Sequence, residues 1–194
     1  RSDENKKSET EAEEDSAWPS RCADPSVGTL VTVLELYSKH SLFDFLITDG
    51  VFPLEVVRHV SQGVAAGVAH LHSHLVAHLD IKLENVCFGA DWTPKVVDLG
   101  FAHKHTEPIM AYKIYIGSPS AMPPEIADHR HDLIKPGYDA FAADIWCVGM
   151  IIFTAIYLVP PYCEKMRHEG SHYHHIVTGA WDKFWSRVER ENQR

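Results

Sequence analysis

The most regular pattern of the chain lies in residues 53–75. Apolar side chains recur there three or four positions apart, at Leu54, Val57, Val60, Val64, Val68 and Leu71. This spacing is one face of an α-helix, and the proline at position 53 suits the first helical position. Just upstream, residues 41–50 predict a short helix that Ser41 caps and Asp49-Gly50 ends.

Two longer apolar runs predict one strand and one helix. Residues 27–36, VGTLVTVLEL, are rich in Val, Leu and Thr and predict a strand. Residues 145–159, IWCVGMIIFTAIYLV, lie between Asp144 and Pro160. A membrane-spanning helix needs about 20 apolar residues, so this shorter run favours a helix buried on all sides in a protein core.

A hairpin is predicted between these runs. The short apolar stretches VCFG and KVVD flank the turn-forming residues 90–94, ADWTP, which is the pattern of two paired strands. A turn centred on Asp91 and Trp92 places Asn85 directly opposite Asp98. We therefore expect these two side chains to lie close together.

The remaining segments carry weaker patterns. Residues 101–143 contain many prolines and glycines without periodicity and predict a long surface segment. Residues 171–194 predict one or two amphipathic helices, in which the helical spacing of three aromatic residues favours core positions for Trp181, Phe184 and Trp185.

Composition and charge narrow the class of protein. The 194 residues are 45% hydrophobic, enough for one sizeable core plus a tail. Part of the net charge of −9 comes from residues 1–24, whose eight acidic and four basic side chains predict disorder. The rest has no basic stripe, which disfavours a nucleic-acid partner. Four scattered cysteines and no apolar leader favour a reducing compartment, the cytoplasm or the nucleus, with no membrane association.

A polar cluster interrupts the apolar segments at Asp80, Lys82 and Asn85, with Asp98 following. A carboxylate can accept a proton, a lysine can neutralise a transferring anion, and amide and carboxylate oxygens suit Mg²⁺. Together they indicate magnesium-assisted phosphoryl transfer, although such residues also decorate solvated turns. A zinc site is disfavoured, because the 14 histidines do not form convergent sets with the cysteines.

These motifs resemble the protein kinase family. The order of the motifs along the chain is that of the family. LELYSKHSLFDFL (34–46) resembles the hinge and first helix of the large lobe, HLDIKLEN (78–85) the catalytic loop and DLG (98–100) the metal motif. GSPSAMPPE (117–125) resembles the substrate loop and DIWCVG (144–149) the start of the central helix. The resemblance covers residues 27–185. It implies an α+β fold: a mainly helical large lobe, a short catalytic-loop hairpin and one remnant strand of an incomplete small lobe.

The resemblance also implies a domain organisation. Residues 1–26 would be an acidic insertion of the small lobe, residues 27–40 its last strand and the hinge, and residues 41–194 a large lobe cut short at its C-terminus. The lysine at position 82 is similar to that of serine/threonine kinases rather than tyrosine kinases.

Roles follow from the resemblance by position. Asp80 would orient a substrate hydroxyl and receive its proton, Lys82 would contact the γ-phosphate of ATP, and Asn85 and Asp98 would hold Mg²⁺. The other implied ATP contacts are Leu34 as gatekeeper, the hinge residues Glu35 and Tyr37, Ser41, Glu84, and Cys87 on the pocket floor. Ser118 would lie in the substrate loop, and structural roles would fall to His78, Glu125 and Asp144, the last by accepting backbone N–H bonds.

The chain departs from the family pattern at several places. Residues 1–26 contain no glycine, so the glycine-rich phosphate loop is absent, as are the strand lysine and its helix glutamate. Leu79 replaces an arginine, Leu99 a phenylalanine and Ala121 an aromatic residue. We expect a serine/threonine kinase acting on a protein hydroxyl, inactive as this chain alone. The alternatives are a pseudokinase scaffold or binding module, and a truncated gene copy without function.

Overall fold

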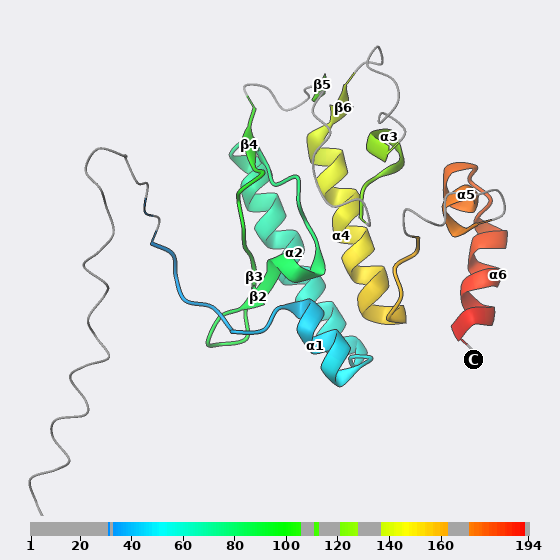
Figure 1. Ribbon diagram of the computed structural model, residues 1–194, viewed down its shortest axis with the longest axis horizontal. Coiled ribbons are helices and arrows are strands. Elements are labelled where there is room, and N and C mark those ends of the chain that lie inside the picture. Colours follow the sequence, from blue (N-terminus) through cyan, green and yellow to red (C-terminus); the bar gives the residue numbers. More distant parts are fainter. Residues whose placement is uncertain are drawn as a thin grey trace, which may run out of the picture. The chain divides into compact units, whose positions relative to one another are not determined.

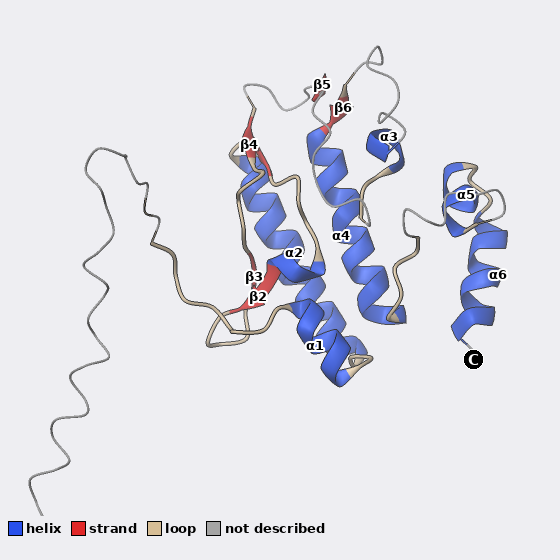
Figure 2. Ribbon diagram, in the orientation of Figure 1, coloured by secondary structure: helices blue, strands red, loops and turns tan. Residues whose placement is uncertain are grey.

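The computed structural model describes residues 31, 33–105, 111–112, 121–127, 137–162 and 171–192 (Figure 1). The chain divides into two units, Arg1–Glu35 and Leu36–Arg194. All helices and strands described below belong to the second unit. Helices dominate it, with short strand pairs between them, as the mainly helical fold class predicted (Figure 2).

Helix α1 spans Leu42–Asp49 and has the predicted caps. The hydroxyl of Ser41 accepts the backbone N–H of Asp44, whose carboxylate accepts the backbone N–H of Ser41 at 2.8 Å, so the two form a capping box. Gly50 ends the helix at φ 77°, a conformation that glycine adopts without a Cβ clash.

Helix α2 spans Leu54–Ser73 and buries the valines of the predicted stripe, Val57, Val60, Val64 and Val68. Two details differ from the prediction. Pro53 is the N-cap, with ψ 147°, rather than the first helical residue. Leu54, the first residue of the predicted stripe, is 70% exposed and does not join the buried face.

Helix α4, Ala140–Tyr157, lies beside α2 (Figure 1). Asp139 caps it by accepting the backbone N–H groups of Phe141 and Ala142 at 2.9 and 3.1 Å. Its Val148 and Ile151 join the valines of α2 in the main core. The helix is not buried on all sides as predicted, since Ile145 is 58% exposed. It is long and apolar enough to cross a membrane, but the partners of its buried Asp144, described below, mark it as a core helix of this domain.

The predicted hairpin is present, but its register is not the predicted one. Strands β2 (Val86–Phe88) and β3 (Pro94–Val96) pair antiparallel with Val86 opposite Val96, so Asn85 lies opposite Val97 and not Asp98. The predicted register was wrong by one residue, because the loop between the strands contains an odd number of residues. The backbone N–H of Gly89 bonds the carbonyl of Thr93, which leaves three loop residues centred on Asp91.

The remaining elements are short. Strand β1 (Val76–Ala77) pairs with β4 (His103–Lys104), and β5 (Ala111–Tyr112) pairs with β6 (Tyr138–Asp139). A 3₁₀ turn η1 covers Leu83–Asn85, and helices α3, α5 and α6 cover Pro124–Ala127, His172–Val177 and Trp181–Asn192. The predicted surface segment 101–143 contains β4, β5, α3, β6 and the first residues of α4. Its residues 106–110, 113–120 and 128–136 lie outside the described ones.

Two further predictions need correction, one of a strand and one of burial. Residues 33–36, part of the expected small-lobe strand, form no strand, and Val33 and Leu36 are 86% and 93% exposed. Apolar β-branched residues need a neighbouring strand to pair with, and no described strand pairs with them. Of the three aromatic residues expected in the core of the C-terminal helices, only Phe184 is buried, while Trp181 and Trp185 are about half exposed.

Candidate active site

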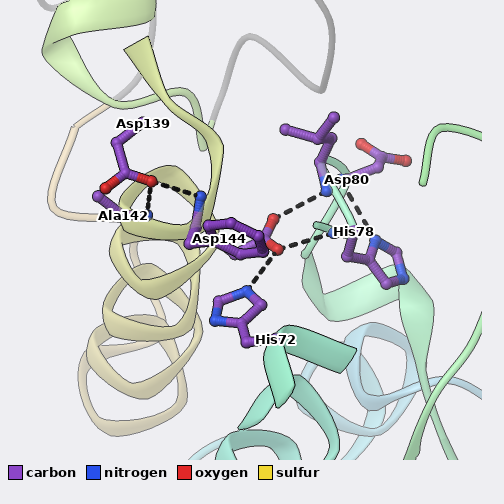
Figure 3. Close-up of polar contacts among 8 residues, drawn as sticks. His72, His78, Asp80, Asp139, Ala142 and Asp144 are labelled. Carbon is purple, nitrogen blue, oxygen red and sulfur yellow. Dashed lines mark hydrogen bonds and ion pairs between the residues drawn. The ribbon is translucent and has the colours of Figure 1, made fainter. Parts of the chain in front are cut away.

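The loop between β1 and η1 is held by a buried carboxylate from helix α4. Oδ2 of Asp144 accepts the backbone N–H of His78 at 2.7 Å, and Oδ1 accepts that of Leu79 at 2.8 Å (Figure 3). Asp144 is 1% exposed, so both bonds are shielded from water. Asp144 thus makes the backbone contacts that the kinase resemblance implied.

A histidine that the sequence did not single out completes this arrangement. His72, on the last turn of α2, donates Nε2–H to Oδ2 of Asp144 at 2.9 Å (Figure 3). Its ring also packs edge-on against Phe141 of α4, with centroids 4.8 Å apart. His72 therefore joins α2, α4 and the loop at one carboxylate. Nothing in the local sequence separates it from His70 and His74, because the partner is distant in the chain.

The loop backbone is strained at Leu79, whose φ is 67°. This left-handed conformation costs about 1–2 kcal/mol for a residue with a Cβ. Two contacts offset the strain: the Asp144 bond to the Leu79 backbone, and burial of the Leu79 side chain beside Ala77 and Met122. The strained residue turns the chain immediately before Asp80, and so it sets the direction of that carboxylate.

His78 joins the loop to the hairpin. Its Nδ1 accepts the backbone N–H of Asp80 at 3.3 Å, which leaves Nε2 to carry the proton and donate it to the carbonyl of Val97 at 3.1 Å. The tautomer is assigned from these partners. The ring is fully buried. His78 therefore fixes the spacing between Asp80 and the residue that precedes Asp98, a positioning role consistent with the structural one expected.

Asp80 and Lys82 come together as the sequence suggested. Nζ of Lys82 lies 2.7 Å from Oδ2 of Asp80, and the amide nitrogen of Asn85 donates to the same oxygen at 3.1 Å and to the Asp80 carbonyl at 2.9 Å. Asp80 is 4% exposed, whereas the side chain of Lys82 keeps 25% of its surface in solvent. The arrangement is a buried, oriented carboxylate next to an ammonium group that reaches the surface.

Asn85 and Asp98 are neighbours across the hairpin, though one register step from directly opposite. The carbonyl of Asn85 accepts the backbone N–H of Val97 at 2.9 Å, and Asp98 follows at φ 65°. Asp98 is exposed, and its Oδ1 accepts the backbone N–H of Gly100 at 3.1 Å. The Asn85 amide nitrogen faces Asp80, so its oxygen faces away from that residue. One amide and one carboxylate oxygen are hard donors of the kind Mg²⁺ prefers.

The residues expected to contact ATP differ in their exposure. Leu34 and Glu35 belong to the first unit and are exposed, Tyr37 is half-buried, and Glu84 is exposed. The structure adds Ser38, which the sequence did not suggest. Its backbone N–H donates to the carbonyl of Phe88 at 2.8 Å, and its hydroxyl accepts the Phe88 N–H at 3.0 Å. These bonds attach the segment after the hinge to β2, beside Cys87.

The remaining residues to which the resemblance gave a role have the following surroundings. Ser41 caps α1. Cys87 is half-buried, and burial raises the pKa of its thiol. Glu125 lies exposed on α3, and Ser118 lies outside the described residues. The structure therefore unites Asp80, Lys82 and Asn85 around one oxygen and places Asp98 two residues beyond the end of β3. The substrate-loop serine lies outside the described residues.

Sequence comparison identifies the family to which the chain belongs. A family model described as "Protein kinase domain" matches residues 24–193. The chain belongs to the protein kinase family. The fold described above is mainly the large lobe of that domain.

Similar curated proteins are serine/threonine kinases. The chain is 30% identical over 132 residues to serine/threonine-protein kinase 36 of Mus musculus, covering 68% of this chain and 10% of that protein. It is 30% identical over 133 residues to the liver/testis phosphorylase b kinase gamma catalytic chain of Homo sapiens, covering 69% and 32%. It is 31% identical over 135 residues to serine/threonine-protein kinase ULK3 of Rattus norvegicus, covering 69% and 27%. The chain spans at most about a third of the length of these relatives.

Proposed function

We propose that the protein to which this chain belongs is a serine/threonine protein kinase that transfers the γ-phosphate of ATP to a protein hydroxyl. The observation that supports this best is the Asp80 carboxylate, 4% exposed, with the Lys82 ammonium and the Asn85 amide on the same oxygen. The relatives that are serine/threonine kinases support the same choice of acceptor. A solvated turn would not bury an acid and fix it from both neighbours.

The proposed step uses this chain's residues for orientation and proton transfer. Asp80 accepts a hydrogen bond from the substrate hydroxyl, whose oxygen attacks the γ-phosphorus while the bond to the β-phosphate oxygen breaks and ADP leaves. The hydroxyl proton passes to the Asp80 carboxylate. Lys82 neutralises charge on the transferring group. Asn85 and Asp98 would hold Mg²⁺, which supplies charge neutralisation at the phosphates when bound.

We propose that this 194-residue chain alone has little kinase activity and weak affinity for Mg-ATP. Its sequence has neither the glycine-rich loop nor the strand lysine that contact the phosphates in the family. Loss of one preorganised electrostatic contact typically lowers a rate by about 10²–10³. Isothermal titration calorimetry with Mg-ATP checks this, and tight binding by the isolated chain would contradict it.

The activity itself is tested in the full-length gene product. Transfer of ³²P from labelled ATP to casein is measured for the wild type, for Asp80→Asn and for Glu189→Gln. Asp80→Asn removes the proton acceptor but keeps the shape, so we expect a fall of about 10²–10⁴ in kcat. Glu189→Gln changes an exposed side chain of α6 and serves as the matched control. Equal rates for all three proteins would exclude the proposed role of Asp80.

A pseudokinase that binds partners without phosphoryl transfer is the alternative, and Leu79 favours it. An apolar, buried residue stands where the family has an arginine before the catalytic aspartate. The full-length measurement separates the two functions. A wild-type protein that is folded but transfers no phosphate, and whose Asp80→Asn variant is indistinguishable from it, would be a binding module.

A further inference from the structure

Two exposed histidines lie one helical turn apart at the C-terminal end of α2. The ring centroids of His70 and His74 are 4.6 Å apart, and the ring planes are inclined by 46°. Side chains at positions i and i+4 of a helix lie on the same face, which explains this contact. Histidine is the commonest metal ligand in proteins, so the pair is a candidate metal site.

The backbone determines which nitrogen of His74 is available to an ion. Nδ1 of His74 lies 2.9 Å from the carbonyl oxygen of His70 and 3.1 Å from Oγ of Ser73. The Ser73 hydroxyl donates its own hydrogen to the same carbonyl at 2.7 Å, so Nδ1–H is the donor in both of its contacts. This tautomer, assigned from the partners, leaves Nε2 of the neutral ring with an unshared electron pair. A bond from the other ring nitrogen to a backbone carbonyl is what typically orients a metal-binding histidine.

His70 can supply the second nitrogen. Within the described part of the chain, no hydrogen bond occupies either ring nitrogen of His70. Two imidazoles on one ion, with metal–nitrogen distances of about 2.0–2.1 Å and an angle of about 90–110° at the ion, have ring centroids roughly 4.5–5.2 Å apart. The observed separation of 4.6 Å lies in this range. Rotation of the exposed rings is therefore sufficient to direct one nitrogen of each toward a shared ion, without movement of the backbone.

The helix end and the ligand type indicate which ions suit the pair. Helix α2 ends at Ser73, and the C-terminal end of a helix carries a partial negative charge that favours a cation. Imidazole nitrogens favour late divalent transition-metal ions such as Zn²⁺, Ni²⁺ and Cu²⁺, whereas Mg²⁺ favours oxygen ligands. The pair is therefore chemically distinct from the proposed magnesium ligands Asn85 and Asp98.

We propose that His70 and His74 chelate one divalent transition-metal ion of the Zn²⁺ type, with Nε2 of His74 as one ligand. The described residues contain no group of three or more His, Cys, Asp and Glu side chains that could hold a metal, so water completes the coordination. The site contains no cysteine, and so it differs from the histidine–cysteine site that the sequence disfavoured. It does not depend on phosphoryl transfer, because neither histidine belongs to the Asp80, Lys82 and Asn85 cluster.

The bound ion acts on the turn that carries His72. This residue lies between the two ligands in the sequence, but two positions along a helix point to different faces, and its ring bonds Asp144 of α4. An ion that bridges positions 70 and 74 holds the last turn of α2 in its helical form. Metal binding therefore stabilises the turn from which His72 reaches Asp144.

A zinc titration followed by NMR tests the site one histidine at a time. Imidazole ¹H–¹⁵N correlations of the chain are recorded with increasing ZnCl₂, in a buffer with excess MgCl₂ to occupy oxygen sites. We expect Nε2 of His74 to shift while Nδ1 stays protonated, and the His70 ring to shift over the same zinc concentrations. Each ring is read separately because the chain has 14 histidines.

Two variants test whether the rings act together. A chelate loses affinity at both rings when either is removed, so His70→Gln should weaken the zinc affinity read at His74 at least tenfold. His74→Gln should weaken the affinity read at His70 to the same extent. The matched control is His59→Gln, an exposed histidine of the same helix whose Nε2 faces the Trp92 carbonyl. It should leave both affinities unchanged.

Hydrogen exchange tests the effect on the helix end. The backbone N–H groups of His74 and Leu75 bond the carbonyls of Leu71 and His72 at 3.0 and 2.9 Å, so their exchange reports the opening of the last turn. Saturating ZnCl₂ should slow the exchange of both amides in the wild type and in the control variant. It should slow neither amide in the two variants that each lack one ligand.

Other results would overturn the proposal. Absence of a zinc-induced shift at either ring would exclude the site, and an affinity at His74 that His70→Gln leaves unchanged would show two independent rings. A zinc-dependent dimer in sedimentation velocity that either ligand variant abolishes would identify an ion shared between two copies of the chain. Circular dichroism of each variant, with the helix signal of the wild type, shows that the loss of binding is not a loss of fold.

Discussion

His72 and Asp144 are 72 positions apart in the sequence, yet Nε2 of the first lies 2.9 Å from Oδ2 of the second. The same carboxylate accepts the backbone N–H groups of His78 and Leu79 in the loop between β1 and η1. Helices α2 and α4 and the loop that carries Asp80 therefore meet at one buried charge. The Asp144 contacts hold the two residues that precede the proposed proton acceptor, while Lys82 and Asn85 contact its carboxylate directly.

Removal of the Asp144 carboxylate should destabilise the domain strongly. Asp144→Ala leaves the backbone N–H groups of His78 and Leu79 buried without acceptors, at about 1–3 kcal/mol each. We expect the free energy of unfolding to fall by about 2–4 kcal/mol in urea denaturation. Glu189→Ala, on the exposed face of α6, should change it by less than about 0.5 kcal/mol. A similar small change for both variants would show that the Asp144 bonds are not formed in solution.

The His72 contact can be measured separately by a double-mutant cycle. His72→Leu and Asp144→Ala each remove one partner, and the double variant removes both. Because the bond involves a charged acceptor that is 1% exposed, we expect a coupling energy of about 1–2 kcal/mol from urea denaturation. Additive effects, within about 0.3 kcal/mol, would mean that the two side chains do not interact.

Two helical glycines should respond oppositely to alanine. A Cβ at Gly63 of α2 would lie 2.7 Å from Cγ of Pro94, a ring carbon of β3 that cannot rotate away. At Gly149 of α4, a Cβ would meet nothing within 4 Å. Gly149→Ala should therefore raise the melting temperature, through a gain of about 0.5–1 kcal/mol in helix stability. Gly63→Ala should lower it, and a rise in both variants would contradict the close packing of α2 on β3.

Acidification should weaken the packing of α5 on α6 through His172. Burial, the main cause, lowers the pKa of His172 below its usual 6.5, although Glu191 at 3.6 Å acts in the other direction. The unfolded chain then binds a proton more readily than the folded one. The stabilising contribution is full above pH 6.5 and is lost as the pH falls from 6.5 through the lower folded-state pKa.

Urea midpoints between pH 7.5 and 5 measure this effect. We expect them to decrease with falling pH, and to decrease less in His172→Gln. His105 contributes in the same direction, because burial also lowers its pKa. His105→Gln is therefore the second variant, and the double variant should show the smallest change. A wild-type midpoint that rises on acidification would contradict the depressed pKa values.

The two described cysteines should differ in reactivity. Burial raises the pKa of both thiols, but that of Cys147 far more, and its Sγ donates to the carbonyl of Ala121 at 3.4 Å. In a Cys22→Ser/Cys163→Ser background, iodoacetamide should label Cys87 first, faster as the pH rises, because the thiolate is the reacting form. Mass spectrometry locates the label. Labelling of Cys147 in the native protein at the rate of Cys87 would contradict its burial.

Local sequence patterns were sufficient to predict the features that depend on residues close together in the chain. The Ser41 cap, the Gly50 end and the valine face of α2 depend on residues within a few positions of one another, and the structure has all of them. The close approach of Lys82 and Asn85 to Asp80 also follows from short spacing within one loop. The order of the kinase motifs then indicated the family, which the match over residues 24–193 shows.

Tertiary structure decided the features that join distant segments. A three-residue loop with Trp92 in the left-handed region moved the hairpin register by one residue, so Val97 rather than Asp98 faces Asn85. The choice of His72 among neighbouring histidines required the position of Asp144 on another helix. The sequence by itself determined the elements, the chemical groups and their order, because these depend on short-range spacing. Only the packing of α2 against α4 and the loop determined which distant groups meet, as at Asp144 and His72, because such a contact joins residues that the chain keeps far apart.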